Sequence, residues 1–295
     1  MKKKILLIGC TGMLGHQVLK VFQNSKEFKI FATYRSKYKL KLVEQYNNHV
    51  IFFKLDVLSK RDLNNLKQKQ FDYIINCAGI IKPHVDDKNK SSILNAIKVN
   101  SEFPHIISEI FPKSKIFQIA TDCVFSGTKG NYTEDDFHDA TDVYGKTKSL
   151  GEVKNNNFFN LRTSIIGKEL DGNFSLIQWF LNSKKNSKLN GFNNHMWNGV
   201  TTTAFANFVL TLIKKETKIP NFIHVIPKNM VTKFEMLINF RRFFLRNDLK
   251  VNKVNAKLAI NRTLNTKYSK LVFQIWKESK YKKIPSFNDM LKEIY

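Results

Sequence analysis

The sequence predicts an α/β protein in which helices cover both faces of a doubly wound parallel sheet, followed by a smaller α+β unit. Short apolar runs typical of buried strands alternate with segments whose apolar residues recur at helical spacing. Repeated strand–helix units of this kind build parallel sheets with right-handed connections. After Gly167 the alternation ends, and at 295 residues the chain is long enough for a second unit.

Six apolar runs are expected to form the strands of the parallel sheet. They lie at residues 5–8, 28–35, 50–57, 71–79, 114–125 and 157–167. Between them, residues 61–69 and 91–111 carry apolar side chains at helical spacing, so we predict helices there.

The second half is irregular, and we expect it to form a smaller α+β cap. Helices are predicted at 173–183, 201–216 and 231–246, and a short strand at 221–227. Threonines, which are good N-cap residues, open the helix at 201–216. Residues 190–199 are rich in Asn and Gly and are predicted to be a loop. We expect residues 200–222 to pack back on the first unit, while the rest of 168–295 forms a cap.

The stretch GCTGMLG follows the first predicted strand and opens a helical pattern. Its Gly9, Gly12 and Gly15 suit a tight turn, a close approach to a pyrophosphate, and close packing of a helix on the sheet. A phosphate would lie at the helix N-terminus, where free N–H groups favour an anion. The alternative is an export signal ending at Cys10, but four apolar residues are too few for its hydrophobic region. We therefore predict a Rossmann-type dinucleotide-binding unit over residues 1–167.

The second predicted strand ends at Tyr34-Arg35-Ser36 without an acidic residue. An acid at this place holds the ribose 2′-hydroxyl of NAD, whereas an arginine suits the 2′-phosphate of NADP. The sequence thus favours NADP(H) and leaves NAD(H) open. In a simpler alternative, Arg35 only stacks on the adenine. Asp56, at the end of the third strand, is placed either to contact the adenine amino group or to cap the next helix.

The stretch DVYGKTKSLGE places Tyr144 and Lys148 four residues apart, on one face of a helix. A lysine ammonium beside a phenol favours the phenolate, so we expect it to lower the pKa of Tyr144 from its usual value of about 10. The preceding strand ends at Thr121, which can donate a second hydrogen bond to a carbonyl oxygen. With the nucleotide site, these residues predict a carbonyl reductase. The alternative is an ordinary Tyr and Lys on the surface of an amphipathic helix.

Charge and cysteine content narrow the class of partner. The net charge is +25, but the lysines are scattered and no basic motif is interleaved with aromatic residues, so we expect no nucleic acid. The charge reflects either heavy use of lysine throughout the chain or the binding of an anionic small molecule or membrane surface. No apolar run approaches the about 20 residues of a membrane span. Three widely spaced cysteines, Cys10, Cys77 and Cys123, indicate reduced thiols in a cytoplasm and lack the spacing of a zinc site, so no metal is expected.

Several motifs follow one another in the order of the extended short-chain dehydrogenase/reductases. They are GCTGMLG, NCAG, VNSEFP, TDCVFSGTKGNYTEDD, DVYGKTKSLGE and LRTSIIG. Up to Gly167 the chain resembles this family, and within it most closely the dTDP-4-dehydrorhamnose reductases; beyond that only GVTT and NRTL match. The resemblance implies a 4-keto-6-deoxy nucleotide sugar as substrate, NAD(P)H as hydride donor, and a role in making sugars for surface polysaccharides. The resemblance leaves open whether the protein forms a homodimer.

The resemblance also implies roles for single residues. Thr121, Tyr144 and Lys148 would be catalytic. The residues implied to line the cofactor are Gly9, Thr11, Gly12, Met13, Leu14, Gly15, Arg35, Asp56, Val57, Cys77, Ala78, Gly79, Asn100, Tyr144, Lys148, Arg162 and Thr163. Those implied to contact the substrate are Thr121, Asp122, Cys123, Tyr144, His195, Trp197 and Arg262, with Lys184 and Lys185 as further cations for its pyrophosphate.

The chain departs from the family pattern at three positions. Ala120 and Cys123 stand where the family has serine and tyrosine, and Asp142 stands where it has asparagine. The second half, which selects the sugar, matches poorly. A nucleotide-sugar reductase is therefore a safer expectation than an enzyme of rhamnose synthesis.

Two other functions remain open at this stage. Cys123 follows Thr121 by two residues, which is the spacing in GDP-fucose synthase, where a cysteine and a histidine epimerise the sugar before reduction. His195 would be that histidine here; in the simpler alternative, Cys123 fills a buried strand end. The chain also resembles the regulatory subunit of methionine adenosyltransferase, which acts by binding a partner. The intact catalytic set argues against a purely regulatory role.

Overall fold

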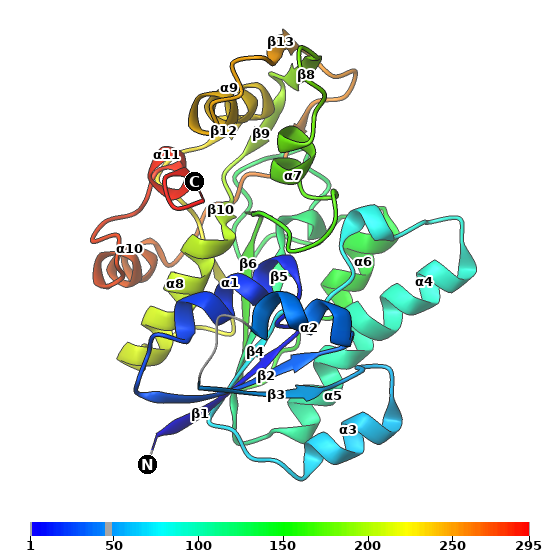
Figure 1. The fold of residues 1–295 in the computed structure, drawn as a ribbon, viewed down its shortest axis with the longest axis vertical. Helices are drawn as coiled ribbons and strands as arrows, with labels where there is room; N and C mark the ends of the chain where they lie inside the picture. Colours follow the sequence, from blue (N-terminus) through cyan, green and yellow to red (C-terminus); the bar gives the residue numbers. More distant parts are fainter. Residues whose placement is uncertain (1, 45–48, 295) are drawn as a thin grey trace.

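A seven-stranded parallel sheet forms the centre of the protein in the computed structural model, which describes residues 2–44 and 49–294 (Figure 1). Its spatial order is β11-β6-β5-β4-β1-β2-β3. The bounds are β1 Lys3–Ile8, β2 Phe28–Tyr34, β3 Val50–Lys54, β4 Tyr73–Asn76, β5 Lys115–Thr121, β6 Phe158–Thr163 and β11 Phe222–His224. The chain runs outward from β1 to β3 and then crosses to β4 on the other side of β1. This reversal opens a crevice at the carboxyl ends of the strands, where ligands of such sheets bind. The predicted doubly wound α/β fold is confirmed.

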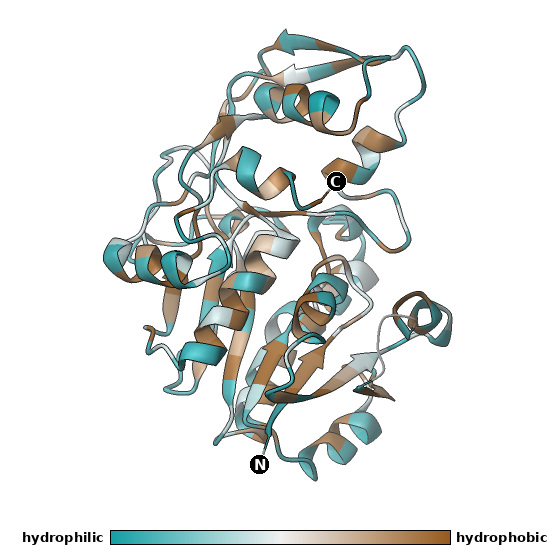
Figure 2. Ribbon diagram, turned by 60° about the vertical axis from the view of Figure 1, so that its left-hand side comes forward, coloured by the Kyte–Doolittle hydropathy of each residue, from teal (hydrophilic) through white to brown (hydrophobic). Residues whose placement is uncertain are grey.

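Helices cover both faces of this sheet. They are α1 Met13–Phe22, α2 Lys37–Glu44, α3 Lys60–Lys67, α4 Lys90–Ala96, α5 Phe103–Ile110, α6 Val143–Leu150, α8 Thr202–Lys215 and α10 Ser269–Glu278. Alternate residues of β1 point to opposite faces, so Ile5 and Leu7 join the core under α1 and α8, while Leu6 and Ile8 join the core under α3 and α5. Strands buried on both sides are hydrophobic along most of their length (Figure 2).

The predicted helix at 91–111 is interrupted. A π-helical segment at Ile97–Glu102 separates α4 from α5 and carries the buried side chain of Asn100. Proline at position 104 follows near the start of α5 and has no N–H to donate to the preceding turn. Such π-helical segments are frequent at functional sites.

The C-terminal unit lies beyond the carboxyl ends of the large sheet, at the top of Figure 1. It contains α7 Leu176–Leu181, β8 Lys188–Phe192, β9 His195–Trp197, β12 Val231–Thr232, α9 Lys233–Phe243, β13 Lys250–Val254, β14 Ile260–Asn261 and α11 Phe287–Leu291. A separate core holds it together, built around Phe180, Phe240 and Phe287. Two short strands, β7 Ile165–Ile166 and β10 Val200–Thr201, pair beneath it.

The predicted loop at 190–199 is wrong. Most of it is strand: β8 pairs with β13, and β9 pairs with β12 and β14. The partner strands come from more than 30 residues later in the chain, so local composition gave no sign of them. Gly191 has a packing role, because a Cβ there would lie 2.6 Å from the Cα of Phe234 on α9.

Residues 200–222 lie against the first unit. The helix predicted at 201–216 is confirmed as α8, and the Thr201 side chain caps it by accepting from the Ala204 N–H. It packs on α1, and the following strand, β11, extends the central sheet beside β6. The domain boundary at residue 167 stays a prediction. Within the described residues no helix has the length and apolar character needed to cross a bilayer.

Candidate active site

The glycine turn joins β1 to α1 at the crevice. Gly9 has φ +78°, a left-handed conformation that suits glycine, and Gly12 is the N-cap of α1. A Cβ on Gly15 would lie only 2.0 Å from the Gly9 carbonyl oxygen, so α1 can pack this closely only because Gly15 has no side chain.

The turn fits the pyrophosphate of a dinucleotide. No side chain caps the N-terminus of α1, and its first turn carries no acidic residue, so its N–H groups are available to an anion. Gly12 is exposed, and the single atom within 4 Å of a Cβ built there is the Gly9 oxygen at 3.5 Å. Thr11 and Met13 border the turn half-buried, whereas the Leu14 side chain belongs to the core and could line a cofactor only through its backbone.

Two residues predicted to contact the adenosine end of the cofactor lie just after the strands β2 and β3. Arg35 is exposed directly after β2, and within the described part of the chain its guanidinium makes no hydrogen bond or ion pair. Asp56 follows β3 beside Val57, and its carboxylate accepts from the Leu58 N–H at 3.0 Å. The cap of α3 is Ser59, so the helix-capping alternative for Asp56 is wrong.

The segment after β4 carries the predicted Cys77, Ala78 and Gly79. Asn100 fixes it, because its side chain accepts from the Ile80 N–H at 2.8 Å and donates to the Ile80 carbonyl at 3.0 Å. Burial raises the pKa of Cys77, so the thiol stays protonated and unreactive. Asn100 thus positions the backbone here.

The three predicted catalytic residues meet at the carboxyl end of β5. Thr121 ends that strand and Lys148, on α6, donates from Nζ to the Ile119 carbonyl of the same strand at 3.1 Å. Tyr144, one turn earlier on α6, lies beside Thr121. The Thr121 hydroxyl itself donates to Asp122 Oδ1 at 3.2 Å and accepts from the Cys123 N–H at 3.2 Å. Two features bring α6 close: Asp142 caps it by accepting from the Gly145 N–H at 2.8 Å, and a Cβ on Gly145 would lie 2.4 Å from the Cys123 carbonyl oxygen.

The expected lowering of the Tyr144 pKa is wrong for this structure. Burial raises it, and the charges of Cys123 and Asp122 add to the effect, while the neighbouring Thr121 hydroxyl opposes it. The Lys148 ammonium points to a backbone carbonyl, and its own pKa falls to about 8 because of burial. A protonated tyrosine is the form that a general acid requires.

The opposite wall of the site comes from the C-terminal unit. Asp122 is buried, which raises its pKa, and the charges of Arg262 and Lys233 oppose that shift. Arg262 donates from Nε to the Phe125 carbonyl at 2.8 Å, which holds it beside the Cys123 loop. Sequence reasoning identified Asp122, Cys123 and Arg262 but missed Lys233.

Lys233 is the first residue of α9. Its Nζ lies 5.8 Å from the centre of the Trp197 ring, and burial lowers its pKa while the charges of Asp122 and Cys123 raise it. Within the described residues it has no hydrogen bond or ion pair. The local sequence signal was the capping box of Thr232 and Glu235. It predicts where the helix starts, but not that the Lys233 side chain lies near Asp122 and Cys123.

The side chains of three residues predicted for the site make their contacts outside it. His195 contacts the Leu258 carbonyl at 3.1 Å and the Phe192 ring, and no contact joins it to Cys123 among the described residues. Trp197 is 4% exposed in the core of the C-terminal unit. The Arg162 side chain is buried in an ion pair, so only its backbone and that of Thr163 could face a cofactor.

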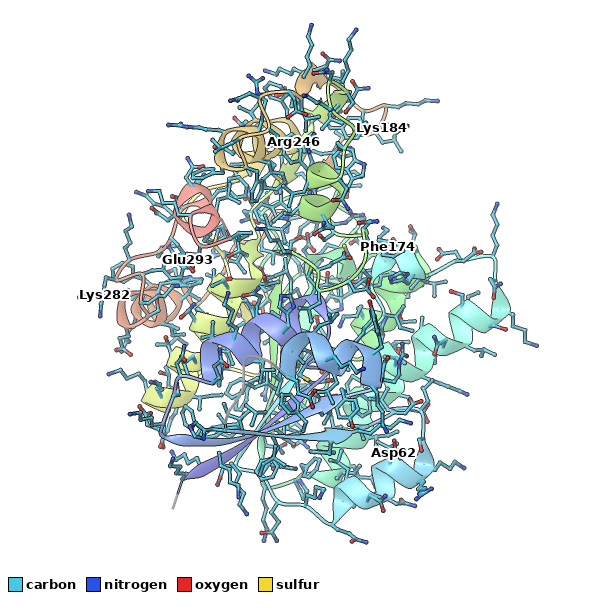
Figure 3. The ribbon with its side chains drawn as sticks, viewed as in Figure 1. Asp62, Phe174, Lys184, Arg246, Lys282 and Glu293 are labelled. Carbon is cyan, nitrogen blue, oxygen red and sulfur yellow. The ribbon has the colours of Figure 1, made fainter. Side chains whose placement is uncertain are left out.

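Lys184 lies on the outer part of the C-terminal unit, away from the crevice (Figure 3). It and Lys185 are exposed in the connection between α7 and β8. No group of three His, Cys, Asp or Glu side chains among the described residues is arranged to hold a metal ion.

Fold and site together define an extended short-chain dehydrogenase/reductase architecture. The chain belongs to the RmlD substrate binding domain family, whose model matches residues 2–295. The resemblance found in the motifs is therefore confirmed.

Solved structures of similar fold cover almost the whole chain. A dTDP-4-dehydrorhamnose reductase from Clostridium acetobutylicum is 22% identical, with a TM-score of 0.73 over 99% of this chain and 98% of its own. The Bacillus anthracis reductase, solved in complex with NADP, is 20% identical with a TM-score of 0.76 over 100% and 99%. An ADP-L-glycero-D-manno-heptose-6-epimerase from Helicobacter pylori is 17% identical with a TM-score of 0.78 over 99% and 95%.

Curated relatives are methionine adenosyltransferase 2 beta subunits. The Danio rerio protein is 26% identical over 151 residues, which is 51% of this chain and 42% of that protein, and the Rattus norvegicus protein is 27% identical over the same length. The chain thus spans less than half of the length of these relatives.

Proposed function

We propose that this protein is an NAD(P)H-dependent reductase of the 4-keto group of a nucleotide-diphosphate deoxysugar. The observation that carries the proposal is the meeting of Thr121, Tyr144 and Lys148 at the carboxyl end of β5. The glycine turn of β1 and α1 opens at the same edge of the sheet. Membership of the RmlD substrate binding domain family supports the substrate class.

Each residue of the set has a distinct task. When bound, the nicotinamide cofactor supplies a hydride to the carbonyl carbon. Tyr144 donates its phenolic proton to the carbonyl oxygen, and Thr121 donates a hydrogen bond to the same oxygen. Lys148, protonated at Nζ, stabilises the negative charge that remains on Tyr144 after the transfer. Asn100 holds the backbone at Ile80, next to the segment after β4.

The test is a screen of nucleotide 4-ketosugars with NADPH and NADH. Oxidation of the cofactor and the structure of the sugar product should identify one preferred substrate, and dTDP-4-dehydrorhamnose is the first to try. Absence of turnover with every 4-ketosugar would reject the proposal.

The guanidinium of Arg35, which has no polar partner among the described residues, favours NADP(H). We expect NADPH to bind more tightly than NADH, and Arg35→Ala to narrow that difference by about 1.5–3 kcal/mol, the scale of a hydrogen bond to a charged group. Binding is measured by cofactor fluorescence. Arg242→Ala on the exposed side of α9 is the control for loss of one positive charge. Equal affinity of the unaltered protein for both cofactors would contradict the assignment.

Lys233 is proposed to bind the anionic or hydroxyl groups of the substrate. Because its ammonium is partly buried without a hydrogen-bond partner, substrate binding gives it one. We expect Lys233→Met to raise KM for the nucleotide sugar about 10-fold or more, with unchanged cofactor affinity. Lys253→Met, on the strand β13, is the matched control. An unchanged KM would place Lys233 outside the substrate site.

Cys123 decides between simple reduction and epimerisation with reduction. Burial and the charge of Asp122 raise the pKa of Cys123 to about 12, so the thiol is a poor base at neutral pH. His195 lies in contact with Leu258 and Phe192. We therefore expect that product formed in D₂O carries no carbon-bound deuterium next to C4. Stoichiometric deuterium there, lost in Cys123→Ser, would move the protein to the epimerase–reductases.

A regulatory role is the second candidate, favoured by the beta-subunit relatives. In that case cofactor would bind, but no 4-ketosugar would be reduced, and Tyr144→Phe would change nothing measurable.

A further inference from the structure

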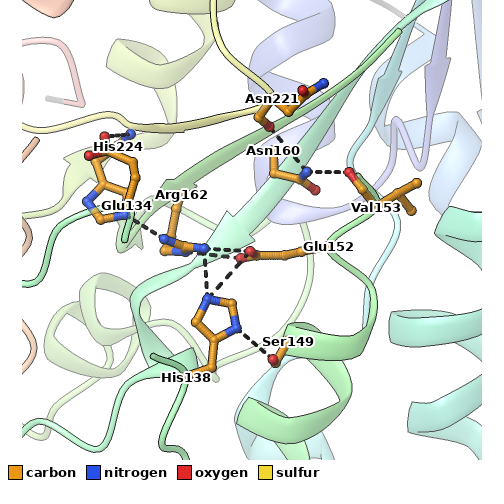
Figure 4. Close-up of polar contacts among 9 residues, drawn as sticks. All are labelled: Glu134, His138, Ser149, Glu152, Val153, Asn160, Arg162, Asn221 and His224. Carbon is orange, nitrogen blue, oxygen red and sulfur yellow. Dashed lines mark hydrogen bonds and ion pairs between the residues drawn. The ribbon is translucent and has the colours of Figure 1, made fainter. Parts of the chain in front are cut away.

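Arg162 of β6 lies at the centre of a buried polar cluster behind the catalytic helix (Figure 4). Its side chain is 2% exposed and that of Glu152 is 3% exposed. The Arg162 Nε donates to Glu152 Oε1 at 3.0 Å, and the two terminal nitrogens of the guanidinium reach His224 Nε2 at 2.6 Å and His138 Nε2 at 2.9 Å.

Both histidines are neutral acceptors in this cluster. His224 Nδ1 donates to the Asn265 carbonyl at 2.6 Å and His138 Nδ1 to the Ser149 hydroxyl at 2.6 Å, so each Nε2 is free to accept from the arginine. Burial and the Arg162 charge lower the pKa of His224 to about 4, and burial lowers that of His138. Glu152 is therefore the group that neutralises the guanidinium.

The cluster is joined to the catalytic helix at two points. Ser149 lies in the last turn of α6, and Glu152 continues that turn, with its N–H donating to the Ser149 carbonyl at 3.2 Å. On the sheet side, Arg162 lies opposite Ala120 of β5 in the parallel register, and Thr163 lies opposite Thr121. The pair thus spans from the end of α6 to the strand beside Thr121.

We propose that the Glu152–Arg162 pair is a positioning element of the active site, which fixes α6 against the sheet and stabilises the Lys148 ammonium through the Glu152 carboxylate. The proposal rests on the reductase function. Glu152 follows Lys148 by four residues and touches no reacting atom, so it acts through Lys148 and Tyr144.

The electrostatic part concerns the charge on Lys148. Burial lowers its pKa to about 8, and the charges of two titratable groups, Glu152 after α6 and Cys77 after β4, oppose that lowering. Gly79 and Asn100, which also lie there, are uncharged. Arg162 does not shift the pKa of Lys148, so removing both charges of the pair takes away the Glu152 contribution and lowers that pKa further. Lys148 then loses its proton at a lower pH than in the unaltered protein.

The first experiment is a pH profile of kcat/KM. Glu152→Gln leaves a buried unpaired guanidinium and destabilises the fold, so the decisive variant is the double change Glu152→Leu with Arg162→Met, which removes both charges. We expect kcat to fall about tenfold with KM nearly unchanged. The alkaline limb should move down by about half a pH unit or more. A folded double variant with the limb and kcat of the unaltered protein would overturn the proposal.

The control is Asp248→Asn, which removes the charge of Asp248 and one of its two hydrogen bonds with Arg246, at 2.8 and 2.7 Å. This pair lies in the C-terminal unit (Figure 3). The Asp248→Asn variant should keep both the alkaline limb of the kcat/KM profile and the kcat of the unaltered protein.

The second experiment needs no substrate. Amide hydrogen exchange of residues 144–150 should be about tenfold faster in the Glu152→Leu/Arg162→Met double variant than in the unaltered protein, while exchange in α9 stays the same; in Asp248→Asn the exchange of residues 144–150 should be unchanged. If no 4-ketosugar is reduced, the proposed function fails while this measurement still tests the positioning. Exchange in α6 that is the same in all three proteins would overturn the proposal.

Discussion

Tyr144→Phe is expected to lower kcat by about 10²–10⁴-fold, the usual contribution of a positioned acid–base group. The phenol lies beside Thr121, and burial holds its pKa above the usual value, so it is protonated at neutral pH. Phenylalanine keeps the ring, and the cofactor affinity should stay close to that of the unaltered protein. Steady-state turnover and cofactor fluorescence measure the two effects separately.

The matched control is Tyr73→Phe. Tyr73 is 5% exposed on β4 and belongs to the core at the other end of the sheet, so the same chemical change there tests loss of a tyrosine hydroxyl alone. Near-normal turnover in Tyr144→Phe would remove Tyr144 from the mechanism, and an equal loss in Tyr73→Phe would point to a general effect on the fold.

Local spacing was sufficient to predict the parts of this site that depend on one element. The three glycines of the turn and the four-residue separation of Tyr144 and Lys148 are properties of a single strand–turn–helix or a single helix turn. The parallel sheet followed in the same way from repeated apolar runs. Each of these features is set by residues close together in the chain.

The parts that sequence reasoning missed depend on contacts across long separations. Lys233 faces Asp122 from 111 residues later, and the strands of 190–199 pair with residues 231–232, 250–254 and 260–261. The Tyr144 pKa was misjudged for a related reason, because its direction depends on burial and on Cys123, while Lys148 points to Ile119. Desolvation is a property of the packed site and has no local pattern.

Gly15→Ala is expected to destabilise the protein and to abolish cofactor binding. The new Cβ would lie 2.0 Å from the Gly9 oxygen and 3.0 Å from the Cys10 Cα, both backbone atoms of the turn, so α1 must move away from β1. Forced overpacking of this kind costs about 1–3 kcal/mol, which corresponds to a fall in Tm of about 5 °C. The displaced helix would also take its N-terminus away from the pyrophosphate.

Gly12→Ala separates the two roles of the turn. Its Cβ would meet the Gly9 oxygen at 3.5 Å, an ordinary contact, and its φ of −83° suits alanine, so Tm should change by only a few degrees. Cofactor affinity should nevertheless fall about tenfold or more, because the methyl group occupies the exposed side along which the pyrophosphate approaches. Thermal unfolding gives the Tm of both variants, and cofactor fluorescence gives their cofactor affinity. Equal Tm values for Gly15→Ala and the unaltered protein would contradict the packing role of Gly15. Unchanged cofactor affinity in Gly12→Ala would mean that the pyrophosphate binds away from this turn, since no other part of the variant is expected to differ.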